Sequence, residues 1–165
     1  GTVIILQASV IFSIVVIGFL TPMILRILHK RYYSHLQLHG YGTWFSPIWV
    51  LFKSSFMMIF LFVILIPVYF VPVLNIIAFS IPFYYFFHKL LNFDVSSTIL
   101  SAEQYKIIYE KEANNFRLRT LFLYFISMIP FATLFTAVYY IIYLGHAYFV
   151  KLDELKKEEI KLISN

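Results

Sequence analysis

The side chains best suited to bind an anion are two arginines in the segment FRLRT, Arg117 and Arg119. A guanidinium is planar and always charged, and its paired donors match the oxygens of an oxyanion. The same residues precede an uncharged run, where they would also anchor a membrane helix by extending toward lipid headgroups. The segment therefore predicts either an anion-attracting pair or a pair of membrane anchors. A structural ion pair between Asp94 and Arg117 is a further expectation.

A second basic cluster consists of Arg26, Lys30, Arg31 and Lys53, and no acidic residue occurs between residues 26 and 53. Such a cluster could collect anions or contact anionic lipid headgroups. Short basic segments also mark the cytoplasmic side of a membrane protein without any ligand. We expect these residues to face the cytoplasm, as anion-attracting candidates or as determinants of topology.

Metal binding and catalysis have little support in the sequence. His35 and His39 are four residues apart in HLQLH, a spacing that could place two imidazoles on one helix face. No third ligand is evident, and an interfacial pair among neighbouring aromatic residues is the simpler explanation. An enzyme would need both histidines to converge with an acid such as Asp94. The chain has no cysteine, phosphate-binding glycine loop or GxSxG motif, so we expect no metal, no cofactor and no enzymatic activity.

The composition excludes a free soluble enzyme. Of the 165 residues, 61% are hydrophobic and only 13% are charged, and the mean hydropathy is +0.83. Soluble domains are about a quarter charged. All charged residues fall within the stretches 26–53, 89–119 and 151–161. Lysines and acids balance in the last of these, so nucleic-acid binding is not expected.

Three uncharged runs separate or precede these stretches, at residues 1–25, 54–88 and 120–150. About 20 apolar residues form a helix that crosses a bilayer. The first run therefore predicts one long transmembrane helix, which together with a basic extension covers residues 1–36.

The second run is shorter than the roughly 44 residues that two crossings and a turn require, and it is too long for one crossing. Pro67, Pro72 and Asn75 lie near its middle, and proline interrupts a helix. We therefore expect a helical hairpin over residues 44–93 with its tip at 67–72. This hairpin either half-penetrates the membrane or spans it twice.

The third run predicts a second, shorter hairpin over residues 116–150, because Pro130 divides it. Irregular backbone at a hairpin tip cannot face lipid. The tips must therefore be buried in protein or line a wet cavity, which predicts a homo-oligomer or a pore. The residues expected to shape the tips or line a path are Pro67, Pro72, Asn75, Pro130 and Thr133.

Amphipathic helices are expected outside the uncharged runs. Ser101 and Gln104 have capping-box spacing and precede apolar residues at helical intervals, which predicts an interfacial helix over residues 101–115. Residues 151–165 carry charge pairs typical of an exposed helical tail. The expected fold is an all-α integral membrane protein, with one long transmembrane helix, two proline-tipped hairpins and interfacial helices in a single membrane domain over residues 1–150.

The order of these features resembles the CysZ family of bacterial sulfate permeases, within an etoposide-induced-protein-like membrane superfamily. The resemblance covers about residues 10–150 and rests on the segments GFLTPMILRIL, IPVYFVPVLNIIAFSIPFYYFF, NFDVSSTILS, FRLRT and MIPFATLF. Asp94 stands where the family tends to have an Asp-Tyr-Pro element, but Val95 and Ser96 follow it here. The family's first transmembrane helix and its loop of glycine and arginine would precede Gly1, so we expect the chain to be a fragment.

The resemblance implies a multi-pass protein of the bacterial inner (cytoplasmic) membrane. It would assemble as a homo-oligomer and admit sulfate or a related oxyanion for sulfur assimilation, with the anion and the lipid bilayer as its partners. The alternative is a non-transporting membrane scaffold, whose hairpins occupy the interface and whose charged tail binds a protein partner.

Overall fold

The computed structural model of the chain describes residues 1–129 and 131–164, with every side chain in them except those of residues 133 and 134. Helices account for most of the described chain, in the order α1 (Thr2–Tyr32), α2 (Ser46–Ile64), the 3-10 helix η1 (Ile66–Phe70), α3 (Leu74–Ile99), α4 (Ala102–Ser127) and α5 (Ala132–Ile163). No strand occurs among the described residues. The predicted all-α class is confirmed.

The helices α1, α2 and α3 are long and apolar enough to cross a membrane. The shortest of them, α2, has 19 residues, which corresponds to about 28 Å at the usual rise of an α-helix. This length is close to the roughly 30 Å hydrocarbon core of a bilayer. Both arms of the expected first hairpin therefore have the length of a complete crossing.

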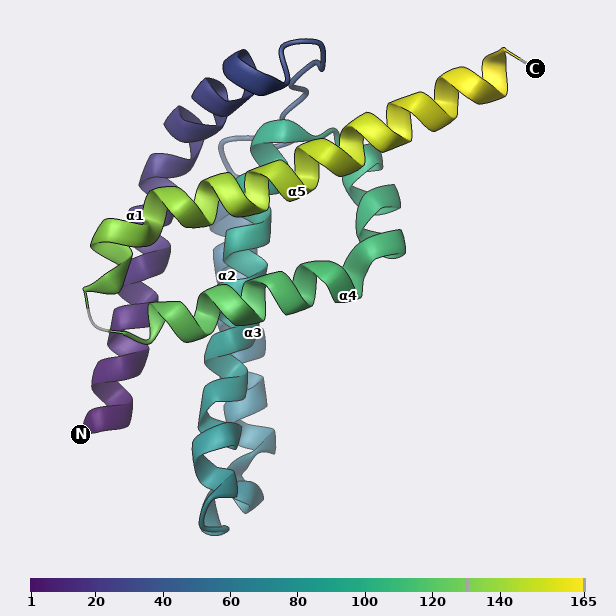
Figure 1. The fold of residues 1–165 in the computed structure, drawn as a ribbon. Helices are drawn as coiled ribbons and strands as arrows, with labels where there is room; N and C mark the ends of the chain where they lie inside the picture. The colour runs from purple at the N-terminus through teal and green to yellow at the C-terminus, as the bar shows by residue number, and fades with distance from the viewer. Residues whose placement is uncertain (130, 165) are drawn as a thin grey trace.

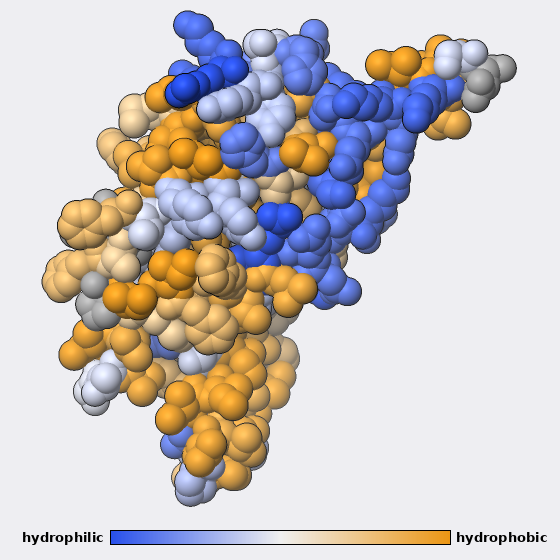
Figure 2. Space-filling view, in the orientation of Figure 1, coloured by the Kyte–Doolittle hydropathy of each residue, from blue (hydrophilic) through white to orange (hydrophobic). Residues whose placement is uncertain are grey.

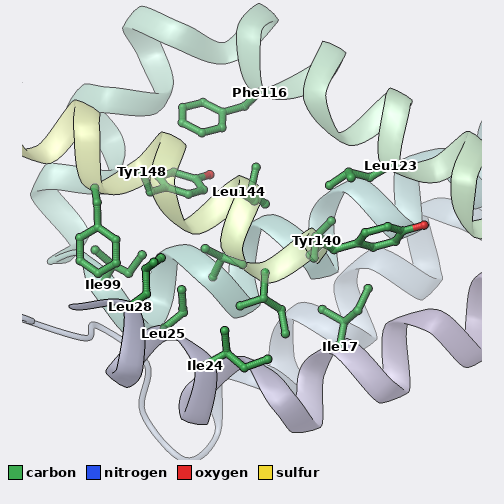
Figure 3. Close-up of a cluster of buried hydrophobic side chains, with 14 of the residues drawn as sticks. Ile17, Ile24, Leu25, Leu28, Ile99, Phe116, Leu123, Tyr140, Leu144 and Tyr148 are labelled. Atoms are coloured by element: carbon green, nitrogen blue, oxygen red, sulfur yellow. The ribbon is translucent and has the colours of Figure 1, made fainter. Parts of the chain in front are cut away.

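A common hydrophobic core joins α1, α3, α4 and α5, and Figure 3 shows part of it. Phe116 of α4 stacks on Tyr148 of α5 with ring centroids 4.2 Å apart. Gly145 lets α5 approach α1 closely, because a Cβ at this position would lie 2.6 Å from Cδ2 of Leu25. The helices α4 and α5 pack against each other and lie across α1 and α3 (Figure 1).

The hairpin of α2 and α3 extends beyond this core, with its tip at the bottom of Figure 1. Pro67 lies in η1, and Pro72 lies in the turn that follows. Val73 caps α3 with a φ of 71°, a left-handed conformation that is uncommon for a β-branched residue. Figure 2 shows a largely hydrophobic surface over this hairpin.

The segment of the second expected hairpin folds as α4 and α5, with two differences at its boundaries. First, α4 runs through residue 116 as one helix, with a kink at Glu112 (φ −121°, ψ 16°). Second, α5 continues through residue 151 to Ile163 without a break. No proline or glycine occurs near either expected boundary, and lysine, glutamate and leucine continue a helix readily. The expected tip residue Pro130 lies outside the described residues.

The first helix with its basic extension was expected over residues 1–36. In the structure α1 ends at Tyr32, and residues 33–45 form a loop. The loop runs beside the end of α3, where the N–H of His39 donates to the carbonyl of Ile99 at 3.2 Å. His35 and His39 are therefore not placed on one helix face. His35 Nε2 instead lies 3.0 Å from Oδ1 of Asp153 in α5.

Candidate anion site

A hollow of about 670 Å³, here termed the first hollow, opens between the loop before α2, the first half of α2, the second half of α3 and the start of α4. Cations, hydroxyl groups and aromatic rings share its walls. No Asp or Glu is among the described residues that line it. These are Tyr41, Thr43, Phe45, Ser46, Trp49, Val50, Lys53, Ser54, Tyr85, Lys89, Phe93, Ala102 and Tyr105.

The positive charge of the first hollow comes from Lys53 on α2 and Lys89 on α3. Neither lysine takes part in an ion pair of the described residues. The Lys89 ammonium lies 5.8 Å from the ring centroid of Tyr85 and 5.7 Å from that of Tyr109, which is within the range of cation–π attraction. Two cations without an acidic partner among the described residues favour the entry of an anion.

Neutral donors complete the first hollow. Burial raises the pKa of Tyr41 and Tyr105 above the ordinary value of a phenol, so both hydroxyls stay protonated at neutral pH. The Tyr41 hydroxyl also lies 3.2 Å from Oγ of Ser96. The hollow also receives the first residues of two helices, Ser46 of α2 and Ala102 of α4. The dipole at the start of a helix favours negative charge nearby.

A smaller hollow of about 330 Å³, here termed the second hollow, adjoins the first and shares Tyr85 and Lys89 with it. Arg117 of α4 is its other cation, and no Asp or Glu is among its described lining residues. The Arg117 guanidinium donates to Oδ1 of Asn114 at 3.2 Å. Lys89 interacts electrostatically with both Lys53 and Arg117. The two hollows therefore form one continuous region of positive charge.

A polar network behind the second hollow joins α3, α4 and α5. His88 Nδ1 lies 2.7 Å from Oγ1 of Thr120 and 3.0 Å from Nδ2 of Asn92, and the Asn92 amide also donates to the His88 carbonyl at 2.8 Å. The other ring nitrogen, Nε2, lies 2.9 Å from the Tyr109 hydroxyl. Tyr148 donates to Oδ1 of Asn92 at 2.6 Å. These contacts hold the His88 ring in the wall of the second hollow.

The two arginines of FRLRT lie on different faces of α4. Two residues along an α-helix correspond to a rotation of about 200°, so neighbours at this spacing point apart. Arg117 lines the second hollow. Arg119 instead donates to Oδ1 of Asn115 at 2.9 Å and lies over the ring of Tyr143 at 5.1 Å. The structure therefore brings only the first of them to the cationic region.

The basic residues of α1 lie apart from both hollows. Arg26, Lys30 and Arg31 are exposed near the end of the helix, and none of them is among the residues that line either hollow. Arg31 lies over the ring of Tyr32 at 5.4 Å. Any attraction of anions by this cluster would therefore act from the protein surface.

The expected tip residues also lie apart from the hollows. Pro67, Pro72 and Asn75 are exposed at the free end of the hairpin of α2 and α3. Thr133 lies in the first turn of α5, and its side chain is outside the described part of the chain. The positive region is instead near the opposite end of α3.

The expected ion pair of Asp94 with Arg117 is not among those that the described residues form. The Asp94 carboxylate lies against α1, where a Cβ at Gly18 would be 3.1 Å from Oδ2. Arg117 faces the second hollow and hydrogen-bonds within α4. The two side chains thus point to different neighbours, and Asp94 does not neutralise the cationic region.

Lys89 is a site residue that the sequence patterns did not single out, and Lys53 was grouped there with the basic residues of α1 rather than with Lys89. A usable signal was nevertheless present. The two lysines flank the uncharged run of residues 54–88, and each is 18 residues from Val71 at the hairpin tip. A symmetric hairpin brings positions equidistant from its tip together, so the two charges must meet across it.

No group of three or more potential metal ligands comes together among the described residues. The site consists instead of lysine and arginine side chains, phenol and alcohol hydroxyls, and helix starts. These groups are donors that suit a negatively charged oxygen.

The fold and the site define an all-helical membrane protein with a cationic region at the charged end of the hairpin of α2 and α3. The model of the family described as Sulfate transporter CysZ/Etoposide-induced protein 2.4 matches residues 1–137. The chain belongs to this family, which confirms the resemblance seen in its segments. No curated protein and no solved structure matched the chain in the corresponding comparisons.

Proposed function

We propose that the protein is a permease of the bacterial inner membrane that admits sulfate or a related oxyanion. The observation that carries the proposal is the first hollow, in which Lys53 and Lys89 lack an acidic partner among the described residues. The family description supports transport of sulfate, and it names a transporter rather than an enzyme. Neither catalysis nor a cofactor is part of the proposal.

The chemistry of the hollow suits a tetrahedral dianion. Two ammonium groups balance two negative charges, and the hydroxyls of Tyr41 and Tyr105 supply further donors without adding charge. Lysine is a flexible point charge, so it can attract an anion and still release it. A permeation site needs this balance. The anion must bind strongly enough to enter the site and weakly enough to leave it.

The remaining cations would act from a distance. Arg26, Lys30 and Arg31 would raise the local concentration of anions at the cytoplasmic surface, an effect that salt screens. Arg117 would extend the positive potential from the first hollow into the second. Arg119 would serve as a membrane anchor, because its guanidinium already contacts Asn115 and the Tyr143 ring.

A homo-oligomer is the second part of the proposal. The exposed hairpin tip, with Pro67, Pro72 and Asn75, presents irregular backbone. Such backbone must lie in water or against protein. In a multi-pass arrangement the tip would reach the far side of the membrane or lie against a neighbouring subunit.

The experiment is sulfate uptake into liposomes that contain the full-length protein. The double variant Lys53→Gln/Lys89→Gln should lower the uptake rate at least tenfold, because the loss of even one charge-assisted hydrogen bond costs on the order of 1.5 kcal/mol. Lys111→Gln/Lys157→Gln is the matched control, since it removes two cations that lie outside the hollows and are paired with acids. Uptake by the wild-type protein no faster than by empty liposomes would contradict the proposal and favour the scaffold function.

A further inference from the structure

An apolar hollow of about 310 Å³ lies between α1, α3 and α4, and is here termed the third hollow. It adjoins the second hollow, with which it shares Ile81 and Tyr84. Its remaining walls are largely aliphatic and aromatic, and include Ile77 and Phe125. No charged residue is among its described lining residues, so it cannot hold an oxyanion.

The polar groups of the third hollow are already used within the protein. The Tyr84 hydroxyl donates to the carbonyl of Arg117 at 2.8 Å. Tyr124, at the other side, donates to Oε1 of Gln7 at 3.0 Å and lies 3.1 Å from the carbonyl of Ser80. Satisfied hydroxyls do not require water. The third hollow is therefore suited to a hydrocarbon chain.

The second and third hollows follow each other along α3, with the cationic one nearer the charged side of the protein and the apolar one nearer the hairpin tip. A bound lipid needs this order of headgroup and acyl chain. The cations Lys89 and Arg117 lie at the end of the second hollow nearer the charged side of the protein. The third hollow extends from Tyr84 back to Ile76, toward the hairpin tip. Figure 2 shows hydrophilic residues gathered at the upper right and hydrophobic residues over the hairpin below. A headgroup in the second hollow would thus have its acyl chain directed into the membrane.

We propose that the second and third hollows together bind one anionic phospholipid, with its phosphate at Arg117 and Lys89 and one acyl chain along Ile77, Ile81 and Phe125. A guanidinium and an ammonium complement a phosphate. A zwitterionic headgroup would place its own ammonium group near Lys89 and Arg117, which have no acidic partner among the described residues. This charge complementarity selects an anionic lipid.

The lipid site is distinct from the proposed oxyanion site. Arg117 lines the second hollow only, whereas Lys53 lines the first only, and Lys89 is shared. The proposal therefore does not depend on sulfate transport. Lys53→Gln should lower sulfate uptake more strongly than lipid binding.

The test is native mass spectrometry of the purified full-length protein with equal amounts of phosphatidylglycerol and phosphatidylcholine. The wild-type protein should retain phosphatidylglycerol preferentially. Arg117→Gln should reduce this preference about fivefold, the effect expected of one basic residue at a membrane surface. Arg26→Gln should leave it unchanged. Equal retention of the two lipids by the wild type, or an equal effect of both arginine variants, would overturn the proposal.

A second pair of variants tests the acyl chain. Ile77 is 59% exposed and lines the third hollow, so Ile77→Trp should fill the space without disturbing the core and should weaken phosphatidylglycerol retention severalfold. Ile11→Trp is the control, because Ile11 is 44% exposed on α1 outside the hollow. Inorganic phosphate is the competitor for the headgroup alone. If it displaces phosphatidylglycerol at equal concentration, or if Ile77→Trp matches its control, the site binds a free anion and the lipid proposal fails.

Discussion

Two charged regions of the protein differ in how their cations are balanced. Between the first half of α4 and the end of α5, Lys151 contacts Glu112 and Glu154, each at 3.0 Å. Lys111 of α4 also lies 3.2 Å from Glu158 of α5. In the two cationic hollows, no described acid pairs with a lysine or arginine.

The difference separates a structural role of charge from a binding role. In the α4–α5 region the acids Glu112, Glu154 and Glu158 offset the charges of Lys111 and Lys151, so little positive charge is left to attract a ligand. In the hollows the positive charge has no acidic partner among the described residues, so it stays available to a ligand. The comparison teaches that the number of cations is a poor guide to an anion site, and that the absence of an acidic partner is a better one.

The largest effect is expected when the hollow is converted into an ion pair. Lys53→Glu should pair with Lys89 across the hairpin, and sulfate uptake should fall by about tenfold or more, because an attractive charge is replaced by a repulsive one. Uptake into liposomes measures the effect. Lys111→Glu in the α4–α5 region is the control, and it should leave uptake within about twofold of the wild type.

A smaller effect is expected when an acid is added at the rim. Thr43 is exposed and lines the first hollow, so Thr43→Glu should lower uptake about fivefold by offsetting one positive charge. Thr43→Gln has nearly the same size and no charge. If both variants reduced uptake equally, the loss would come from the shape of the rim, and the electrostatic role of the hollow would be wrong.

The α4–α5 region should respond in stability rather than in transport. Glu112→Gln removes the charge that faces Lys151, and we expect thermal unfolding in detergent to report a loss of about 0.5 kcal/mol, the usual size of a partly exposed ion pair. Sulfate uptake should be unchanged. A large loss of uptake with an unaltered melting temperature would mean that the two regions do not have separate roles.

The pH dependence of stability offers the smallest effect. Hydrogen bonds from Lys151 and Asn115 lower the pKa of Glu112, and those from Lys157 and His35 lower the pKa of Asp153. A carboxyl whose pKa is lower in the folded protein contributes stability above its unfolded pKa and loses it as the pH falls. The free energy of unfolding should therefore decrease slightly below about pH 4.5, which is the ordinary pKa of glutamate.

Glu112→Gln should flatten this decrease in a melting curve recorded against pH. A variant that retained the full acid response would show that other carboxyl groups cause it.

Much of the fold could be predicted from the sequence, because lipid imposes strong rules on local pattern. Uncharged runs marked the helices α1, α2 and α3 as membrane-spanning candidates. Pro67 and Pro72 marked the turn between two of them, and the capping box of Ser101 and Gln104 marked the start of α4. Each of these signals acts over a few residues and needs no knowledge of distant contacts.

The boundaries within α4 and α5 could not be predicted in this way. No proline or glycine in the sequence marks the kink at Glu112. The kinked residue forms an ion pair with Lys151 of α5. The continuation of α5 through residue 151 agrees with the helix propensity of its lysine, glutamate and leucine residues, and only its pairing with α4 depends on the tertiary fold.

The candidate site was only partly predictable for a related reason. Arg117 was singled out by residue type, but the direction of its side chain relative to Arg119 depends on the rotation of α4. Lys53 and Lys89 become a pair only when the hairpin closes. The expected partner of Arg117, Asp94, lies against Gly18 of another helix, which no spacing along the chain reveals.

The most direct test of the central claim is whether sulfate binds beside the unpaired lysines of the first hollow. Trp49 lines this hollow, and Trp44 is the other tryptophan of the chain, so the variant Trp44→Phe leaves a single fluorescent reporter at the site. Titration with sulfate, at an ionic strength held constant with chloride, should give a saturable change in Trp49 emission. Adding Lys53→Gln and Lys89→Gln should weaken the apparent affinity about tenfold or more. An identical titration with and without the two lysines, or no saturable change at all, would contradict the account.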